Sequence, residues 1–301
     1  MKYFHGNSKV NQFFEGWYFK HQNSKVSISF IPGVVMDENS CATAFIQIIT
    51  AKKSHFITYP ISKFFADANT LFIKIDKNVF TKQGIHIDID EKDANGEQVR
   101  LKGYFFYGKT SPLPYSIMGP LQALCLPCKH GIISMRHSVN GVMSYNDTVI
   151  KMDDGIGYME TDYGSSFPND YFWTQYNGKE KKQPQIFASI ATIPLCKKLI
   201  LGTVAIINYK NKQYRLATYL GAKVLIIRES LAIIQQKKYI LVIHMKHHKP
   251  QSLKAPVEGT MSRLIREDLV CPIRYEFYRG REKIFDIITQ RGSFEYVIQK
   301  P

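Results

Sequence analysis

The segment Ile85-His86-Ile87-Asp88-Ile89-Asp90 alternates isoleucine with polar residues. Successive side chains of a β-strand point to opposite faces, so this spacing places the isoleucines on one face and the polar residues on the other. Val26–Phe30 and Phe72–Asp76 alternate in the same way. No segment keeps a helical period for long, and Ser111–Leu126 and Pro168–Trp173 allow only short helical pieces. The sequence therefore predicts an all-β protein.

Turn signals separate further strand-like runs along the chain. Asn95-Gly96, Asn140-Gly141 and Asn177-Gly178 are dipeptides that favour the positive φ angles of tight hairpins. Many short strands joined by tight turns are typical of antiparallel sandwiches and barrels. About 16 strands fit two barrels of about eight strands better than one. We therefore expect an N-terminal barrel over residues 1–150 and a C-terminal barrel over residues 151–301.

The composition indicates a protein with a core. Hydrophobic residues make up 45% of the chain, which excludes a disordered tail protein, and no run approaches the ~18 apolar residues of a spanning helix. The start of the chain lacks the apolar run of a secretory signal, so we expect a cytoplasmic protein. Lys and Arg outnumber Asp and Glu by 40 to 25, but they are spread along the chain. We expect no nucleic-acid partner and at most a loose association with an anionic membrane surface.

The five cysteines do not indicate a disulfide framework. Cys41, Cys196 and Cys271 stand alone beside apolar residues, and we expect them to be small buried side chains in a reducing compartment. Cys125-Leu-Pro-Cys128 has the spacing of a redox pair or of half a zinc site, but the chain has no second such pair. Its role stays open between a structural one and a redox or metal-binding one.

Two segments combine carboxylates with aromatic rings and hold both tryptophans. If both are strands, each gathers these groups on one face: Phe13, Glu15, Trp17 and Phe19 in the first, and Tyr158, Glu160 and Asp162 in the second. One interpretation is that each carboxylate binds backbone amides and fastens loops at the rim of a barrel. The other is that an aromatic pocket desolvates a carboxyl and raises its pKa, so that it acts as an acid.

These residues resemble the tocopherol cyclase family in its compact bacterial form. The matching residues run in one order through most of the chain: Phe14–Lys20, Phe30–Gly33, Ala44–Gln47, Ile117–Pro120, Cys128, His130-Gly131, Ser134-Met135, Tyr158, Glu160, Gly164, Ser166–Pro168, Phe172-Trp173, Gln175, Asn177, Ala255-Pro256, Gly259 and Met261–Arg263. Thr161, Asp162 and Tyr163 stand where plant cyclases carry Lys, Asn and Trp. The resemblance therefore implies a fold and a ligand class rather than a particular product.

The implied fold is two consecutive lipocalin-like antiparallel β-barrels with few short helices, akin to carotenoid hydratase-like proteins. The implied function is to bind a prenylated quinol or another isoprenoid in an apolar pocket and to protonate its double bond for chroman ring closure. That reaction needs a protonated carboxyl, aromatic rings beside a tertiary cation, and a site without water. No cofactor or metal is expected, because the sequence has no phosphate-binding glycine loop, dinucleotide fingerprint or nucleophile elbow.

The expected site combines acids with aromatic and polar ligand contacts. The candidate catalytic residues are Glu160, then Asp162 and Glu15. The candidate substrate-binding residues are Trp17, Tyr18, Tyr158, Tyr163, Phe167, Trp173, Gln175 and His130. His130 and His137 flank the strand of the central motif, and they are either satisfied rim residues or a proton relay. His244, His247 and His248 are expected in a solvated loop.

Three classes of function remain open from the sequence. The first is an intramolecular lyase or isomerase that acts on an isoprenoid double bond. The second is a non-catalytic carrier of a hydrophobic ligand, such as an isoprenoid quinol or a lipid. The third is an interaction protein whose barrels have no pocket. The first two differ in whether a carboxyl in the pocket is protonated and positioned, so the sequence does not decide whether the protein is an enzyme.

Overall fold

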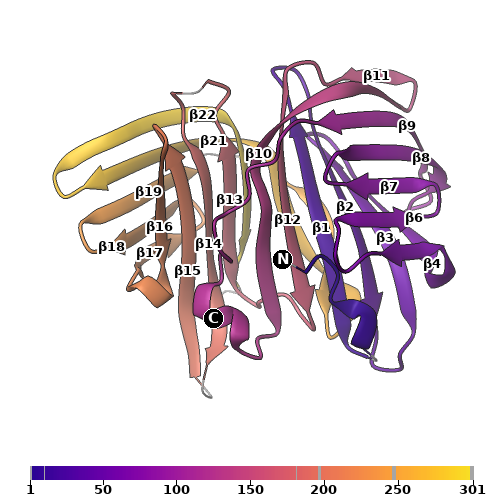
Figure 1. Cartoon of the computed structure of the whole chain (residues 1–301), viewed down its shortest axis with the longest axis horizontal. Coiled ribbons are helices and arrows are strands. Elements are labelled where there is room, and N and C mark those ends of the chain that lie inside the picture. Colours follow the sequence, from indigo (N-terminus) through magenta and orange to yellow (C-terminus); the bar gives the residue numbers. More distant parts are fainter. Residues whose placement is uncertain (1, 10, 181, 196–197, 246–248, 299–301) are drawn as a thin grey trace. The chain divides into compact units, whose positions relative to one another are not determined.

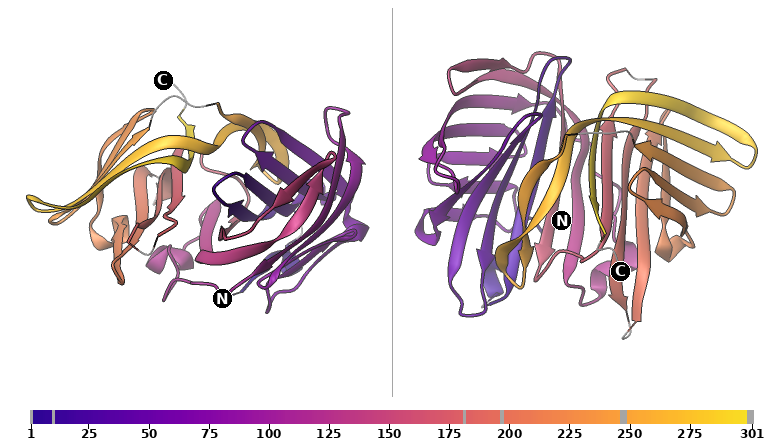
Figure 2. Two further views of the ribbon diagram at one scale, coloured as in Figure 1. Left: turned by 90° about the horizontal axis from the view of Figure 1, so that it is seen from above. Right: turned by 180° about the vertical axis from the view of Figure 1, so that it is seen from behind.

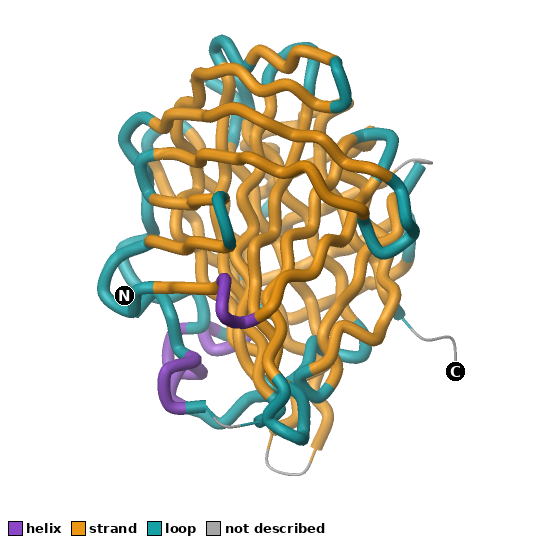
Figure 3. Tube along the Cα trace, turned by 90° about the vertical axis from the view of Figure 1, so that its right-hand side faces the viewer, coloured by secondary structure: helices purple, strands orange, loops and turns teal. Residues whose placement is uncertain are grey.

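Antiparallel strands make up most of the computed structural model, which describes residues 2–9, 11–180, 182–195, 198–245 and 249–298. Within these ranges, helix is limited to four 3-10 turns (Figure 3): η1 (Gly6–Ser8), η2 (Ile61–Lys63), η3 (Gly119–Ala123) and η4 (Thr218–Leu220). None of the described helices has the length and apolar character needed to cross a membrane. The prediction of an all-β protein is confirmed.

The first sheet has 12 strands and follows an up-and-down path. Its strands are β1 (Phe13–Gln22), β2 (Ser27–Met36), β3 (Ala42–Thr50), β4 (Ser54–Pro60), β5 (Phe64–Ala66), β6 (Phe72–Ile75), β7 (Asn78–Thr81), β8 (Gly84–Lys92), β9 (Gln98–Tyr107), β10 (Cys128–Tyr145), β11 (Thr148–Lys151) and β12 (Gly155–Gly164). Neighbours along the chain pair from β1 to β4 and from β5 to β10, and β12 pairs with both β10 and β1. The described strands β4 and β5 are joined by η2 without pairing, so the sheet curls around without closing (Figure 2).

The second sheet has 10 strands and repeats this path. Its strands are β13 (Tyr171–Asn177), β14 (Gln185–Leu195), β15 (Lys198–Tyr209), β16 (Lys212–Ala217), β17 (Lys223–Arg228), β18 (Leu231–Gln236), β19 (Tyr239–Met245), β20 (Gln251–Val257), β21 (Thr260–Arg279) and β22 (Glu282–Val297) (Figure 1). β22 returns to pair with β13, and η4 interrupts the path between β16 and β17. The side-chain amide of Gln236 bridges this gap, because it accepts a hydrogen bond from Ala217 N and donates one to Arg215 O.

Both sheets therefore have the expected lipocalin-like antiparallel architecture, with one difference. The expected barrels are closed, whereas in each observed sheet a 3-10 turn carries the chain from the fourth strand to the fifth without pairing them. A three-residue turn continues the curl of the sheet but takes the two strands out of the hydrogen-bonding ladder. Each sheet thus keeps two unpaired edges at this point of its path.

The chain divides into two compact units. Unit 1 comprises Met1–Ser116, Pro127–Phe167 and Leu253–Leu264, and unit 2 comprises Ile117–Leu126, Pro168–Ser252 and Ile265–Pro301. The expected boundary between residues 150 and 151 lies inside unit 1, ahead of β12. β12 belongs there because it pairs with β1 and β10. The hairpin of β20 and the first residues of β21 also belongs to unit 1.

Each unit has its own hydrophobic core. In unit 1 the isoleucines of Ile85–Ile89 are buried while His86 is exposed, as their alternation predicts. This core also takes in aromatic side chains from β1, β2, β7 and β9: Trp17, Phe19, Phe30, Phe80 and Phe105. The core of unit 2 is built around Phe172, Ile186, Tyr275, Phe277 and Phe294.

One predicted turn is a strand. Asn95-Gly96 connects β8 to β9, and Asn177-Gly178 ends β13, but Asn140-Gly141 lies inside β10. Gly141 has a φ of 143°, and a Cβ there would lie 2.3 Å from the carbonyl oxygen of Tyr104 on β9. The glycine is therefore required by the close approach of two strands rather than by a turn.

The cysteine predictions hold in part. Cys271 is buried as expected, but Cys41 is exposed, because it follows a turn at the start of β3. Cys196 lies outside the described residues, as do His247 and His248. His244 was expected in a loop, yet it lies in β19 with its Nε2 3.3 Å from an Oε of Glu276. Cys125 and Cys128 are both free thiols.

Candidate functional site

The pairing of β1 with β12 sorts the candidate residues onto two faces of the first sheet. Tyr18 lies opposite Glu160, and Gly16 lies opposite Asp162. The next residue along each strand points the other way, and Trp17 accordingly belongs to the unit 1 core. Tyr18, Glu160 and Asp162 therefore share the face that points away from this core, which we call the outer face. The opposite one is the core face.

His130 brings an imidazole between the two carboxyl groups of the outer face. β10 pairs with β12 so that His130 lies opposite Asp162. Its Nδ1 is 2.8 Å from Asp162 Oδ1, and its Nε2 is 3.5 Å from Glu160 Oε2. The hydroxyl of Tyr158 donates a 2.5 Å hydrogen bond to the same oxygen of Glu160. We call His130, Tyr158, Glu160 and Asp162 the acid cluster.

The two carboxylates hold a proton on His130. Burial by itself would lower the pKa of this imidazole, but the charges of Asp162 and Glu160 outweigh burial and raise the pKa to about 9. Burial and the Glu160 carboxylate raise the pKa of the Tyr158 phenol well above its ordinary value, so this hydroxyl remains a donor. At neutral pH the acid cluster therefore contains an imidazolium.

Side-chain exposure falls along the acid cluster. It is 23% for Asp162, 15% for His130 and 6% for Glu160. The two nitrogens of His130 face the two carboxyls at either end of this line. His130 thus lies between the more exposed carboxyl of Asp162, to which it is hydrogen-bonded, and the less exposed carboxyl of Glu160, with which it forms an ion pair.

Further side chains on the outer face provide rings and an amine. The ring of Tyr18 meets that of Tyr158 edge to face at 6.4 Å, and its hydroxyl accepts a hydrogen bond from Ser29. Lys20 lies opposite Tyr158 and is only 2% exposed. The sequence analysis did not place Lys20 among the site residues, because only the strand register shows that this side chain shares a face with the acid cluster.

An apolar cluster adjoins the acid cluster at Cys128. The thiol of Cys128 is 3.9 Å from Asp162 Oδ1, and the same side chain packs against a group formed by Phe14, Val35 and Phe45. Phe167 belongs to this group, with its ring edge-on to that of Phe14 at 5.3 Å. The predicted contact Phe167 thus lies in an apolar cluster next to the acids.

Glu15 lies on the core face and has different partners. Its carboxylate is 2.7 Å from the backbone nitrogen of His5 and 2.8 Å from the Nδ1 of that residue. The ring of His5 stacks on Tyr163 at 3.6 Å. Burial raises the pKa of Glu15, although the contacts with His5 oppose the shift. Glu15, His5 and Tyr163 therefore form a second group. Trp17, on the same face of β1, donates a hydrogen bond to Tyr3 O and helps to fasten the N-terminal residues.

Trp173 and Gln175 belong to unit 2. Both lie in β13, whose Phe172 and Tyr176 contribute to the unit 2 core. Because side chains alternate along a strand, Trp173 and Gln175 point away from that core, and both are buried.

His137, the second predicted relay histidine, lies apart from His130. Its Nδ1 is 3.1 Å from the hydroxyl of Ser134, and its ring lies 4.5 Å from that of Tyr107. Tyr107 also contacts His21 Nε2 through its hydroxyl at 2.5 Å. Burial lowers the pKa of His21 to about 3 and that of His137 to about 4. Both rings are therefore neutral and do not extend the acid cluster.

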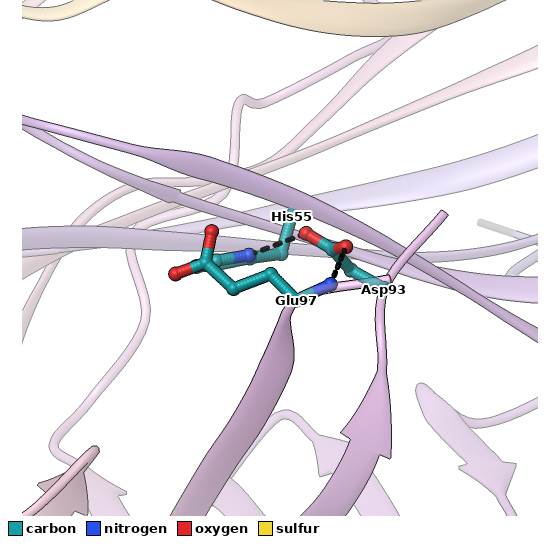
Figure 4. A group of neighbouring side chains, drawn as sticks. All are labelled: His55, Asp93 and Glu97. Carbon is teal, nitrogen blue, oxygen red and sulfur yellow. Dashed lines mark hydrogen bonds and ion pairs between the residues drawn. The ribbon is translucent and has the colours of Figure 1, made fainter. Parts of the chain in front are cut away.

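A third histidine group was not found from the sequence. His55 on β4 contacts Asp93 Oδ2 through Nδ1 at 2.8 Å and the hydroxyl of Tyr145 through Nε2 at 2.7 Å. Asp93 also accepts hydrogen bonds from the backbone nitrogens of Asn95 and Glu97. Figure 4 shows the contacts of Asp93 with His55 and Glu97. These bonds lower the pKa of Asp93 although its burial opposes them. We call this group the His55 clip, because it joins β4 to the turn between β8 and β9.

Two groups of described residues have ligand atoms close enough together for one metal ion. They are His55 with Asp93 and Glu97, and His130 with Glu160 and Asp162. In the first group Asp93 and Tyr145 engage both ring nitrogens of His55, and Lys53 pairs with Glu97. In the second group the imidazolium already pairs with both carboxylates. A metal ion would have to displace these internal partners.

Two solved structures have the same fold as this chain. One is a protein from Nitrosomonas europaea provisionally designated AttH, which aligns over 94% of this chain and 92% of its own length with a TM-score of 0.55 and 11% identity. The other is kievitone hydratase from Nectria haematococca, which aligns over 94% and 88% with a TM-score of 0.55 and 9% identity. No protein-family model and no curated protein sequence matches the chain. The structural similarity supports the fold, and the likeness to tocopherol cyclases rests on the sequence.

Proposed function

We propose that this protein protonates the double bond of an isoprenoid ligand at the acid cluster, in the manner of a tocopherol cyclase. The observation that carries the proposal is the placement of His130 between Asp162 and Glu160, on one face with Tyr18 and Tyr158. This arrangement combines a proton store, a poorly exposed carboxyl and aromatic rings. These are the groups that protonation of an alkene requires.

The proposed acid is Glu160. An apolar ligand that covers the cluster would favour transfer of a proton from His130 to Glu160, because the transfer converts an ion pair into two neutral groups. Glu160 then gives this proton to the less substituted alkene carbon, and the π electrons form the new C–H bond. The tertiary carbon becomes a cation, which the rings of Tyr18 and Tyr158 stabilise.

The phenol oxygen of a prenylated quinol then attacks the cation. The new C–O bond closes the chroman ring, and the phenol proton returns to the Glu160 carboxylate. The reaction is an isomerisation, so no proton is gained or lost over a cycle. If water attacks the cation instead, the product is a hydrated alcohol, which is the outcome that the fold similarity to kievitone hydratase favours.

A non-catalytic carrier is the alternative. The all-β fold supports ligand binding as well as catalysis, since small curled sheets of this kind enclose apolar molecules. We place either activity in the cytoplasm, because Cys41 and Cys125 are exposed free thiols, as a reducing compartment would keep them.

Incubation with a panel of prenylated quinols in deuterium oxide tests the proposal. Protonation by the enzyme places deuterium on the former alkene carbon, which mass spectrometry of the extracted ligand detects. A deuterated product with the formula of the substrate indicates cyclisation, and a product that gains one water indicates hydration. Ligand that binds stoichiometrically but never acquires carbon-bound deuterium would establish a carrier and refute the proposed chemistry.

A further inference from the structure

Unit 2 carries most of the positive charge of the chain. It contains 21 Lys and Arg against 9 Asp and Glu, a net charge of +12, whereas unit 1 contains 19 against 16, a net charge of +3. The two values add up to the +15 of the whole chain. The charge looks evenly spread along the sequence because each unit is assembled from three separate segments.

Unit 2 also exposes large aliphatic side chains. The exposed large hydrophobic residues among its described residues are Leu124, Leu199, Leu201, Leu220, Leu225 and Ile288. The exposed fraction reaches 74% for Leu199, at the start of β15. All six of these side chains are aliphatic. Apolar side chains that gather on a surface mark a contact with a partner or a membrane.

Four of these leucines belong to neighbouring segments. Thr203 of β15 donates its backbone N–H to the Thr218 hydroxyl, which in turn donates to Thr203 O, so β15 adjoins η4. The hydroxyl of Tyr219 in η4 donates to Ile117 O, just before η3. In Figure 1 the start of β15 and the magenta turn η3 lie along the lower side. We call the leucines of these segments the leucine end of unit 2: Leu124, Leu199, Leu201 and Leu220.

Exposed lysines flank the leucine end. Lys198 directly precedes Leu199, and Lys223 follows Leu220 at the start of β17. A long lysine side chain can lay its methylenes on an apolar surface while its ammonium reaches phosphate groups. Leucine tips beside lysines are the composition of protein surfaces that bind at the boundary between lipid headgroups and acyl chains.

We propose that the leucine end of unit 2 docks on an anionic lipid bilayer. The leucines enter the boundary of the acyl chains, and the net charge of the unit draws it to the negative surface. This inference rests on the charge and surface of unit 2, and it stands whether or not the acid cluster of unit 1 is catalytic. A docked protein would take an isoprenoid or lipid ligand from the bilayer that dissolves it.

The chemistry of the exposed side chains favours lipid over nucleic acid. Proteins that bind single-stranded nucleic acids stack bases on exposed aromatic rings, and they share the positive charge with lipid-binding surfaces. The exposed large hydrophobic side chains of the described part of unit 2 are leucines and an isoleucine. Such side chains contribute little to base stacking and enter acyl chains readily.

Sedimentation of the full chain with vesicles tests the proposal. One set of vesicles is pure phosphatidylcholine, and the other also contains phosphatidylglycerol. We expect binding to the anionic vesicles, with a loss of affinity of about tenfold or more in the Leu199→Ser, Leu201→Ser double variant and a similar loss at high salt. The control is Ile288→Ser, which removes an aliphatic side chain on β22 that is 68% exposed, between the values for Leu199 and Leu201, and should bind as wild type does.

Three outcomes would overturn the proposal. The first is the absence of binding to anionic vesicles. The second is equal binding by wild type and the double variant, which would show that the vesicles attract the protein through its charge and not through these leucines. The third is binding to a fluorescent polyuridine strand with no binding to vesicles, which would identify a nucleic-acid surface. Circular dichroism of the double variant checks its fold, and turnover at the acid cluster in detergent is measured separately, so failure of one proposal does not affect the other.

Discussion

The carboxyl groups of Glu15 and Glu160 come from paired strands and lie on opposite faces of one sheet. Glu160 lies opposite Tyr18 on the outer face, whereas Glu15 lies opposite Tyr163 and contacts His5 on the core face. The two strands that carry these acids are hydrogen-bonded neighbours, but the two carboxyl groups contact different residues because they lie on opposite faces of the sheet. A reaction that uses His130 and the Tyr158 hydroxyl has access to Glu160 but not to Glu15.

Replacing Glu160 by Gln should stop turnover and spare ligand binding. The amide keeps the size of the side chain but has no acidic proton, and loss of a general acid costs about 10²–10⁴ in rate. The measurements are kcat with a prenylated quinol and the Kd of the same ligand. Glu91→Gln, an exposed change on β8, is the matched control. Turnover that survives Glu160→Gln and is lost in Glu15→Gln would move the acid to the core face.

Stability should fall as pH rises through the titration of His130. The pKa of this imidazole is raised from 6.5 to about 9 in the folded protein. A raised pKa contributes stability that is fully present below pH 6.5 and is lost as pH rises through about 9. At ~1.4 kcal/mol per pKa unit, the free energy of unfolding should fall by roughly 3 kcal/mol over this range.

The comparison with His130→Gln isolates this effect. The variant has no imidazole to titrate, so its free energy of unfolding in urea should change less between neutral and alkaline pH than that of wild type. His86→Gln changes an exposed histidine of the same sheet and serves as the control. Parallel curves for wild type and His130→Gln would show that the carboxylates do not hold a proton on this ring.

The local fold could be predicted from the sequence because strand alternation is a local pattern. In Ile85–Ile89, the alternation of isoleucine with polar residues is enough to predict which side chains are buried. The break at η2 and the place of β12 in unit 1 depend on pairing between segments far apart in the chain, such as Thr161 with Trp17. Asn140-Gly141 carries the local signal of a turn, yet the approach of β9 decides its conformation.

For the candidate site, too, the arrangement within one strand could be predicted from the sequence, but the contacts between strands could not. Tyr158, Glu160 and Asp162 share a face because they alternate within one strand. The contact of His130 with Asp162 depends on how β10 registers against β12, and that register contains irregularities. Lys20 and His55 carry no local signal, since their neighbours come from distant segments.

The neutral histidines of the unit 1 core should make the protein sensitive to acid. Burial lowers the pKa of His21 to about 3 and that of His137 to about 4, from 6.5. Below pH 6.5 the unfolded chain therefore binds protons at these histidines that the folded protein does not bind. The stability present above pH 6.5 is lost as pH falls below it. In His21→Phe, the free energy of unfolding should depend on pH less steeply by about 1.4 kcal/mol per pH unit in this range. Urea titrations at several pH values measure the slope, and an unchanged slope would mean that His21 is protonated in the folded state.

The His55 clip should contribute to stability rather than to turnover. Replacing His55 by Ala leaves the Asp93 carboxylate and the Tyr145 hydroxyl without this buried partner, which costs about 2–4 kcal/mol. Urea unfolding of His55→Ala should show this loss, while kcat stays as in wild type at a temperature where both are folded. His86→Ala, which removes an exposed ring, should change the unfolding free energy little. Thermal unfolding with added zinc distinguishes the clip from a metal site. If zinc raises the unfolding temperature of wild type but not of His55→Ala, then His55, Asp93 and Glu97 hold the ion. Such binding would displace Lys53 from Glu97 and the Nδ1 proton from His55.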